Sequence, residues 1–192
     1  MNNPATPSSR TFIRKVTRTD EAEFVSLMQN SRDLHEPWIS PPTSRMLYRH
    51  YMQRVAAADH EGIVICRRQD QRIVGAVNLN NIVRGSFLSA SLGYYVGAEF
   101  HGQGYMQEGL LQVIEYATGT LGLHRLEANI QPDNHRSQQL VARCGFEREG
   151  YSRDFLYING AWRDHVRWCY IANRNSLRSE LSQTPTDIHE QA

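Results

Sequence analysis

Apolar residues recur along this chain with two periods, one typical of helices and the other of strands. The clearest helical pattern has apolar residues at positions i, i+4, i+7, i+8 and i+11, which are Met106, Leu110, Val113, Ile114 and Ala117. With about 3.6 residues per turn, these side chains share one face. We therefore expect an amphipathic helix after Gly104 that buries this face.

Runs rich in β-branched and aromatic residues predict strands along much of the remaining chain. The expected strands are Phe12–Val16, Gly62–Arg68, Arg72–Val83, Phe87–Val96, Leu123–Ile130, Phe146–Ile158 and Ala161–Ile171. Two helices are expected in the first half, one capped by Thr19 or Asp20 and one opened by Thr43. A short helix is expected after Asn134, ending at Gly145.

The predicted element order is β-α-α-β-β-β-α-β-α-β-β. Most neighbouring strands are joined by short turns, and Asn159-Gly160 is the strongest hairpin signal among them. Two helices instead cross over between strands. This order predicts an α+β fold with a mixed, mostly antiparallel sheet of about seven strands and about four helices.

The length and charge of the chain narrow its class. Its 192 residues suit one domain, which we expect at residues 12–171 between polar tails at 1–11 and 172–192. A net charge of +1 is too small to attract the whole protein to nucleic acid or to an anionic membrane. The N-terminus lacks a signal-peptide pattern, and no apolar run approaches the ~20 residues of a membrane span. We therefore expect a cytoplasmic protein without direct nucleic-acid or membrane binding.

The cysteines and histidines do not suggest a metal centre. Cys66, Cys144 and Cys169 lie far apart, and no CxxC pair occurs. None of the eight histidines has HExxH spacing or lies in a Cys/His cluster. These patterns predict reduced cysteines and no metal cofactor.

A glycine-bearing loop precedes the amphipathic helix and carries the most informative chemistry. Gly102 and Gly104 allow the backbone to approach a ligand, and the following helix N-terminus adds unpaired N–H donors and a partial positive charge. Together they suit a pyrophosphate. A Rossmann fingerprint would need glycine where Gln107 stands, and a Walker A loop is absent. The alternative is a tight turn that only caps the helix.

The loop from His101 to Met106 resembles the acyl-CoA loop of the GCN5-related N-acetyltransferase superfamily, whose pattern is Arg/Gln-x-x-Gly-x-Gly/Ala. Gly104 matches the central glycine, whereas His101 and Met106 depart from the first and last positions. Three further segments are similar to the family, namely Asn134–Ser137, Gly145–Gly150 and Asn159–Asp164.

A narrower similarity points to the ribosomal-protein alanine N-acetyltransferases of this superfamily. It is carried by Asn81–Phe87, Leu92–Tyr94, Gly102–Gly104 and Trp162–Val166, and the whole resemblance runs from about Phe12 to Tyr170. It implies direct acetyl transfer from acetyl-CoA to an amine without an acyl-enzyme. The implied acceptor is the N-terminus of a ribosomal protein or another peptide, most specifically an alanine, and the implied enzyme is a monomer or homodimer.

The resemblance also implies which residues bind acetyl-CoA. Backbone donors around His101–Met106 would hold the pyrophosphate, and Tyr94–Val96 would flank the pantetheine arm. A backbone N–H near Tyr95 or Val96 would stabilise the thioester oxyanion. The expected acetyl-CoA residues are Tyr94, Tyr95, Val96, His101, Gly102, Gln103, Gly104, Tyr105, Met106 and Asn134.

Three residues are candidates for moving protons. Ser137 matches a family serine near the CoA sulfur, where a hydroxyl would donate a hydrogen bond to the leaving thiolate and relay a proton. Its alternative is a first-turn helix residue bonded to its own backbone. Glu127 or Asp154 would poise a water as base, and an ion pair is the alternative for each. Asn129 stands where another group of ribosomal acetyltransferases has a glutamate, and it cannot serve as a base.

The acceptor site has weaker candidates. Trp38 and Trp162 would line it, and core packing is the alternative for Trp38. Arg84 would bind a peptide backbone or carboxylate, and the alternative is a solvated arginine in a turn. Two other functions remain open. One is acetylation of a small amine such as a polyamine, and the other is acyl-CoA binding without turnover by a regulatory or ribosome-assembly protein.

Overall fold

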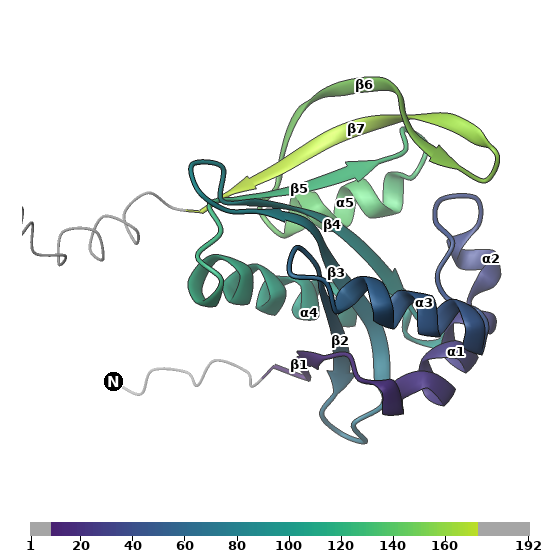
Figure 1. Ribbon diagram of the computed structural model, residues 1–192. Helices are drawn as coiled ribbons and strands as arrows, with labels where there is room; N and C mark the ends of the chain where they lie inside the picture. Colours follow the sequence, from purple (N-terminus) through teal and green to yellow (C-terminus); the bar gives the residue numbers. More distant parts are fainter. Residues whose placement is uncertain (1–8, 173–192) are drawn as a thin grey trace, which may run out of the picture.

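Residues 9–172, which the computed structural model describes, form one seven-stranded sheet with helices against both faces (Figure 1). The strands are β1 (Thr11–Lys15), β2 (Glu61–Arg67), β3 (Ile73–Val83), β4 (Ser89–Val96), β5 (Arg125–Ile130), β6 (Glu147–Ile158) and β7 (Ala161–Ile171). The helices are α1 (Glu21–Gln29), α2 (Arg32–His35), α3 (Arg45–Val55), α4 (Tyr105–Glu115) and α5 (His135–Arg143). The predicted α+β fold is confirmed, and the single turn α2 is an addition to it.

The two central strands separate halfway along the sheet. The strand order is β1-β2-β3-β4-β5-β7-β6, and β4 with β5 is the one parallel pair among these strands. Their ladder joins only residues 89–92 to residues 125–128. Beyond it, β4 continues along β3 to Val96, and β5 continues along β7 to Ile130. In their C-terminal halves, β4 and β5 therefore have backbone groups that form no hydrogen bonds between the two strands.

The alternation of side chains along β4 assigns each face to one group of helices. The Tyr95 ring packs edge-on against Phe24 of α1, which places α1 on that face. The next side chain, Tyr94, meets Ser137 of α5 and faces the other way. The predicted apolar stripe, from Met106 in α4 to Ala117 in the turn that continues it, is buried.

Some element ends differ from the predictions, and hydrogen bonds explain them. α3 begins after Ser44 and not at Thr43, because the Ser44 hydroxyl accepts a hydrogen bond from the backbone N–H of Leu47. β5 begins two residues late, since the N–H groups of His124 and Arg125 both donate to the carbonyl of Leu88. The helical segment of α4 continues through one π turn, residues 116–120.

The predicted tails lie mostly outside the described residues, which exclude 1–8 and 173–192. Ser9 and Arg10, at the end of the expected N-terminal tail, form hydrogen bonds with the folded domain. The sheet begins at Thr11, which is fully buried. No helix between residues 9 and 172 is long and apolar enough to cross a membrane.

Candidate active site

The loop before α4 presents a run of unpaired backbone donors. Gly102 and Gly104 adopt φ angles of 76° and 84°, which glycine reaches without steric strain. Within residues 9–172, no backbone N–H from residue 102 to residue 107 donates a hydrogen bond to the chain, and the N–H of Glu108 is the first to bond back, to Gly104. These donors, at the positive end of α4, can bind an anion such as a pyrophosphate.

The side chains of this loop pack against the protein. Met106 is buried in the core, and Tyr105 stacks edge-on against Phe100 with 6.0 Å between ring centroids. The Gln103 amide donates to the carbonyl of Glu99 at 2.6 Å. Because Met106 points into the core, its departure from the family's small residue leaves the backbone donors of the loop in place.

Hydrogen-bond alternation along β4 decides which backbone groups face β5. The N–H of Gly97 donates to the carbonyl of Val74 at 2.8 Å, so the odd-numbered residues of this strand bond to β3. The N–H groups of Tyr94 and Val96 therefore point to the side where pairing with β5 has ended. Of the two predicted oxyanion donors, Val96 is the better placed, because the N–H of Tyr95 is used in the β3 ladder.

Tyr94 and Ser137 come together beside the separated strands. The Tyr94 Oη and Ser137 Oγ share a hydrogen bond of 2.5 Å. Asn134 fixes the start of α5, because its Oδ1 accepts the N–H of Ser137 at 3.2 Å. Burial raises the pKa of Tyr94, and this effect exceeds the opposite influence of the Ser137 bond. The pair therefore consists of two neutral hydroxyls at neutral pH.

A buried histidine holds the end of β4 from the other face. The Nε2 of His35, in α2, donates to the carbonyl oxygen of Val96 at 3.0 Å. Its Nδ1 is buried and has no partner among the residues that the structure describes. Burial lowers the pKa of His35, so the ring is neutral at pH 7. His35 therefore positions Val96 with an uncharged donor.

Charged and polar groups occupy the face of β5 opposite to Tyr94. Glu127 accepts hydrogen bonds from Arg125 at 2.7 Å and from Arg167 at 3.4 Å, which is the ion-pair alternative raised for it. Asn129 lies two residues further on this face, past the last β4–β5 pair. Its Oδ1 is buried and unpartnered within residues 9–172. Such an oxygen can accept a hydrogen bond from an amine or a water.

The loop after α2 and the β6–β7 hairpin meet above this end of the sheet (Figure 1). Asn159, at the hairpin tip, accepts from the Ser40 hydroxyl and donates to the Pro37 carbonyl, each at 3.0 Å. The Gln131 amide, directly after β5, donates to the Trp38 carbonyl at 3.1 Å. These bonds place Trp38 at the C-terminal end of β5, beside the separated strands.

Three other predicted residues lie elsewhere. Arg84 donates to the carbonyl of Leu121, at the opposite end of α4 from the glycine loop, so the structure does not bring it to the separated strands. Asp154 is exposed in a bulge of β6, and its N–H donates to the Asp164 carboxylate at 2.9 Å. Trp162 is 61% exposed on the hairpin.

A cavity of about 350 Å³ lies further along β6 and β7 and is lined by Glu149, Gly150, Tyr151, Ser152 and Arg167.

The described residues contain no group of three or more His, Cys, Asp or Glu side chains that could hold a metal ion.

A model of the acetyltransferase (GNAT) domain matches residues 10–147. The chain belongs to the GNAT acetyltransferase family.

Known GNAT proteins resemble this chain to different extents. The ribosomal protein uS5-alanine N-acetyltransferase of Escherichia coli (strain K12) is 48% identical over 97 residues, which is 50% of this chain and 50% of that protein. The chain thus aligns with half the length of this relative. Spermidine N(1)-acetyltransferase of Vibrio cholerae is 24% identical, and the match covers 90% of this chain and 99% of that protein. RimJ of Mycobacterium smegmatis, solved with CoA-disulfide, has a TM-score of 0.75 and 27% identity over 91% of this chain and 85% of that one.

The sequence pattern does not identify His35 as a functional residue, nor does it identify the Tyr94 hydroxyl as the partner of Ser137. For Tyr94 a signal existed, because it lies two residues after Leu92 and so shares the face toward which the helix after β5 packs. For His35 the sequence offers no comparable signal. It precedes a segment with three prolines, and that segment predicts only a loop.

We expect His35 to make the stability of this GNAT fold depend on acid pH. Its pKa in the folded protein is below the value of about 6.5 expected in the unfolded chain, so the unfolded chain binds more protons as the pH falls past that value. The free energy of unfolding should therefore decrease on acidification. We expect urea denaturation at about pH 7.5 and about pH 5.5 to show a smaller decrease in His35→Gln, which keeps an N–H for Val96 but takes up no proton.

The exposed His50 on α3 provides the control. His50→Gln should retain the acid sensitivity of the wild type. Identical pH dependence in His35→Gln and the wild type would show that His35 takes up no proton on unfolding.

Proposed function

We propose that this chain transfers the acetyl group of acetyl-CoA directly to the α-amine of a protein N-terminus, and that its acceptor is an N-terminal alanine of a ribosomal protein. The observation that carries the proposal is the separation of β4 from β5, with the glycine loop at one end and the Tyr94–Ser137 pair beside it. The identity to the Escherichia coli uS5-alanine enzyme over half the chain supports the acceptor.

The reaction forms one bond and breaks one bond at the same carbon. The neutral amine nitrogen attacks the thioester carbonyl carbon, the C–N bond forms, and the C–S bond breaks to release the CoA thiolate. The surplus proton of the amine leaves to water or a base, and the thiolate gains a proton that solvent supplies by way of the Ser137 hydroxyl. No acyl-enzyme is required when the two substrates meet directly between the separated strands.

Backbone and hydroxyl groups supply the donors for this reaction. The N–H groups of residues 102–107 bind the phosphates, and the N–H of Val96 stabilises the negative charge that develops on the thioester oxygen. Tyr94 donates to Ser137, and Ser137 donates to the departing sulfur. A chain of two hydroxyls strengthens the final donor, because each hydrogen bond polarises the next.

The acceptor approaches from the face of Asn129. The Asn129 oxygen accepts one N–H of the amine, and solvent carries the surplus proton away. Glu127 is held by two arginines and acts through the field that it creates and not as the direct base. Trp38 lies at the edge where the peptide enters.

A protein N-terminus suits a site without a strong base. An α-amine has a pKa of about 7.7–8.0, so a substantial fraction is neutral at pH 7, whereas a lysine amine near 10.4 is almost fully charged. We therefore expect a peptide with a free N-terminal alanine to react at least about 10-fold faster than the same peptide with a blocked N-terminus and an internal lysine. Mass spectrometry of the products identifies the acetylated amine.

A polyamine acceptor is the second candidate, because a spermidine acetyltransferase matches nearly the full chain. Spermidine belongs in the same competition assay. A kcat/KM for spermidine above that for every N-terminal peptide would replace the peptide proposal with the polyamine one. Acetyl-CoA binding without turnover of any amine would leave the binding-protein alternative.

A further inference from the structure

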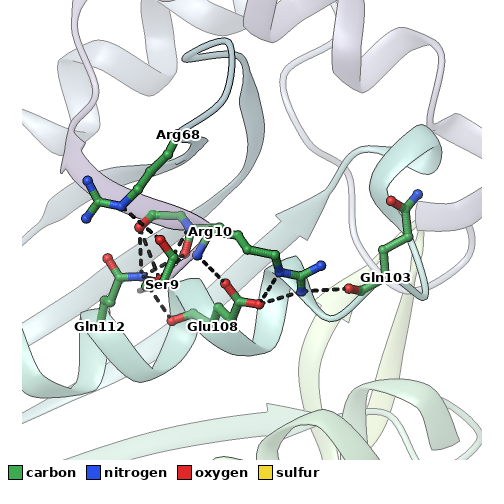
Figure 2. A network of polar contacts seen from close by, with 7 residues as sticks. Ser9, Arg10, Arg68, Gln103, Glu108 and Gln112 are labelled. Atoms are coloured by element: carbon green, nitrogen blue, oxygen red, sulfur yellow. Dashed lines mark hydrogen bonds and ion pairs between the residues drawn. The ribbon is translucent and has the colours of Figure 1, made fainter. Parts of the chain in front are cut away.

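An arginine from the start of the described chain reaches into the glycine loop (Figure 2). The Nη2 of Arg10 donates to the carbonyl of Gln103 at 2.9 Å, and its Nε donates to the Glu108 carboxylate at 2.7 Å. Its guanidinium also lies over the ring of Tyr105, with the carbon 4.4 Å from the ring centroid. One side chain thus contacts the loop before α4 and the first turns of the helix itself.

These contacts oppose two features that would weaken phosphate binding. A carbonyl in a loop of N–H donors repels an anion when it turns toward the site, and Arg10 holds the carbonyl of Gln103 by a hydrogen bond. Glu108 places a negative charge close to the helix N-terminus, and Arg10 forms an ion pair with it. The hydrogen bond from Arg10 to Glu108 raises the pKa of Arg10.

The segment that carries Arg10 is itself anchored to the domain. The Arg10 carbonyl accepts the N–H of Arg68, and the Arg68 side chain donates to the Ser9 carbonyl at 2.9 Å. The Gln112 amide, from α4, donates to the Ser9 hydroxyl at 3.0 Å and to the Thr11 hydroxyl at 2.7 Å. The backbone N–H of Arg10 also donates to Glu108 at 3.0 Å. Arg10 therefore reaches the loop from a fixed backbone.

We propose that Arg10 is a positioning residue for acetyl-CoA, holding residues 102–104 in the conformation that binds the pyrophosphate and neutralising Glu108 beside it. The inference rests on the proposed use of this loop for acetyl-CoA. It assigns a function in cosubstrate binding to the segment before β1, which the sequence pattern classes as part of a tail.

The test compares a thioester that has the pyrophosphate with one that lacks it. We expect Arg10→Ala to raise the calorimetric Kd for acetyl-CoA about fivefold or more and to leave kcat within twofold, because the lost hydrogen bonds act on the bound phosphates. With S-acetylpantetheine, which carries no pyrophosphate, kcat/KM should match the wild type within about twofold. Arg10→Lys, which cannot bond Glu108 and Gln103 together in the same planar geometry, should fall between the two.

Two further variants separate this role from a general structural one. Arg45→Ala removes another surface arginine paired with a glutamate, Glu21, and should leave the Kd unchanged. Adding Glu108→Gln to Arg10→Ala should recover part of the lost affinity, because it removes the uncompensated carboxylate.

An unchanged Kd in Arg10→Ala would overturn the inference, and so would equal losses with acetyl-CoA and S-acetylpantetheine. Failure of the wild type to bind acetyl-CoA would overturn the proposed function together with this inference. The wild-type measurement therefore distinguishes the two failures.

Discussion

Replacing Gly104 with valine is expected to raise the Kd for acetyl-CoA at least about tenfold. Gly104 has a φ of 84°, a region in which a β-branched residue is strained by roughly 1–2 kcal/mol or more. A Cβ there would also lie 3.2 Å from the Nη2 of Arg10, so the arginine would have to shift. Both effects disturb the loop whose N–H groups are proposed to bind the phosphates. Isothermal titration calorimetry with acetyl-CoA measures the change.

Gly122 gives a matched control at the other end of the same helical segment. Its φ is 65°, and a Cβ there would meet nothing within 4 Å. Gly122→Val should therefore lower the thermal stability through backbone strain and leave the CoA affinity within about twofold. A folded Gly104→Val protein that binds CoA like the wild type would remove the loop from the phosphate site.

The fold was predictable because its signals are local and periodic. The α4 stripe is spaced for one helix face, and all five of its members are buried. The Asn159-Gly160 turn joins β6 to β7 as expected. The crossover helix between β4 and β5 also predicts a parallel neighbour, which the sheet contains. Each of these features depends on residues close together in the sequence.

The candidate site was predictable only where a motif lies within one segment. The glycine loop and the start of α5 are such segments. Alternation along β4 indicates the face on which Tyr94 lies but not its partner. The bond between Tyr94 and Ser137 spans 43 positions, and the contact from His35 to Val96 spans 61, so no local pattern identifies either pair. They depend on how α2 and α5 pack on opposite faces of one strand.

Arg84 shows that a sequence motif does not specify where its residues lie in the fold. It lies in a sequence segment that resembles the family, yet the turn after β3 is at the far end of β4 from Val96. Its guanidinium donates to the carbonyl of Leu121, where the α4 segment ends and carbonyl groups lack helical partners. A motif identifies residue types along the chain, whereas the strand direction decides which end of the sheet they reach.

Removing either hydroxyl of the Tyr94–Ser137 pair is expected to lower kcat by about 10- to 100-fold, which corresponds to roughly 1.4–2.7 kcal/mol of transition-state stabilisation. The KM for acetyl-CoA should change little, because the thiolate that the pair stabilises exists only as the C–S bond breaks. Steady-state kinetics of Ser137→Ala and Tyr94→Phe between about pH 6 and about pH 9 measure both parameters. Tyr48→Phe is the control, since its buried hydroxyl donates to the Thr17 carbonyl, away from β4.

The double variant distinguishes a relay from two separate contributions. If Tyr94 acts only by donating to Ser137, then Tyr94→Phe should cost almost nothing further in a Ser137→Ala background. Losses that add in the double variant would mean that each hydroxyl reaches the substrate independently. Wild-type kcat in Ser137→Ala would instead return Ser137 to the role of a first-turn residue capped by Asn134, and proton transfer to the thiolate would then fall to solvent. A loss in Glu127→Gln larger than either hydroxyl variant would identify that carboxylate as the base, despite its two arginine partners.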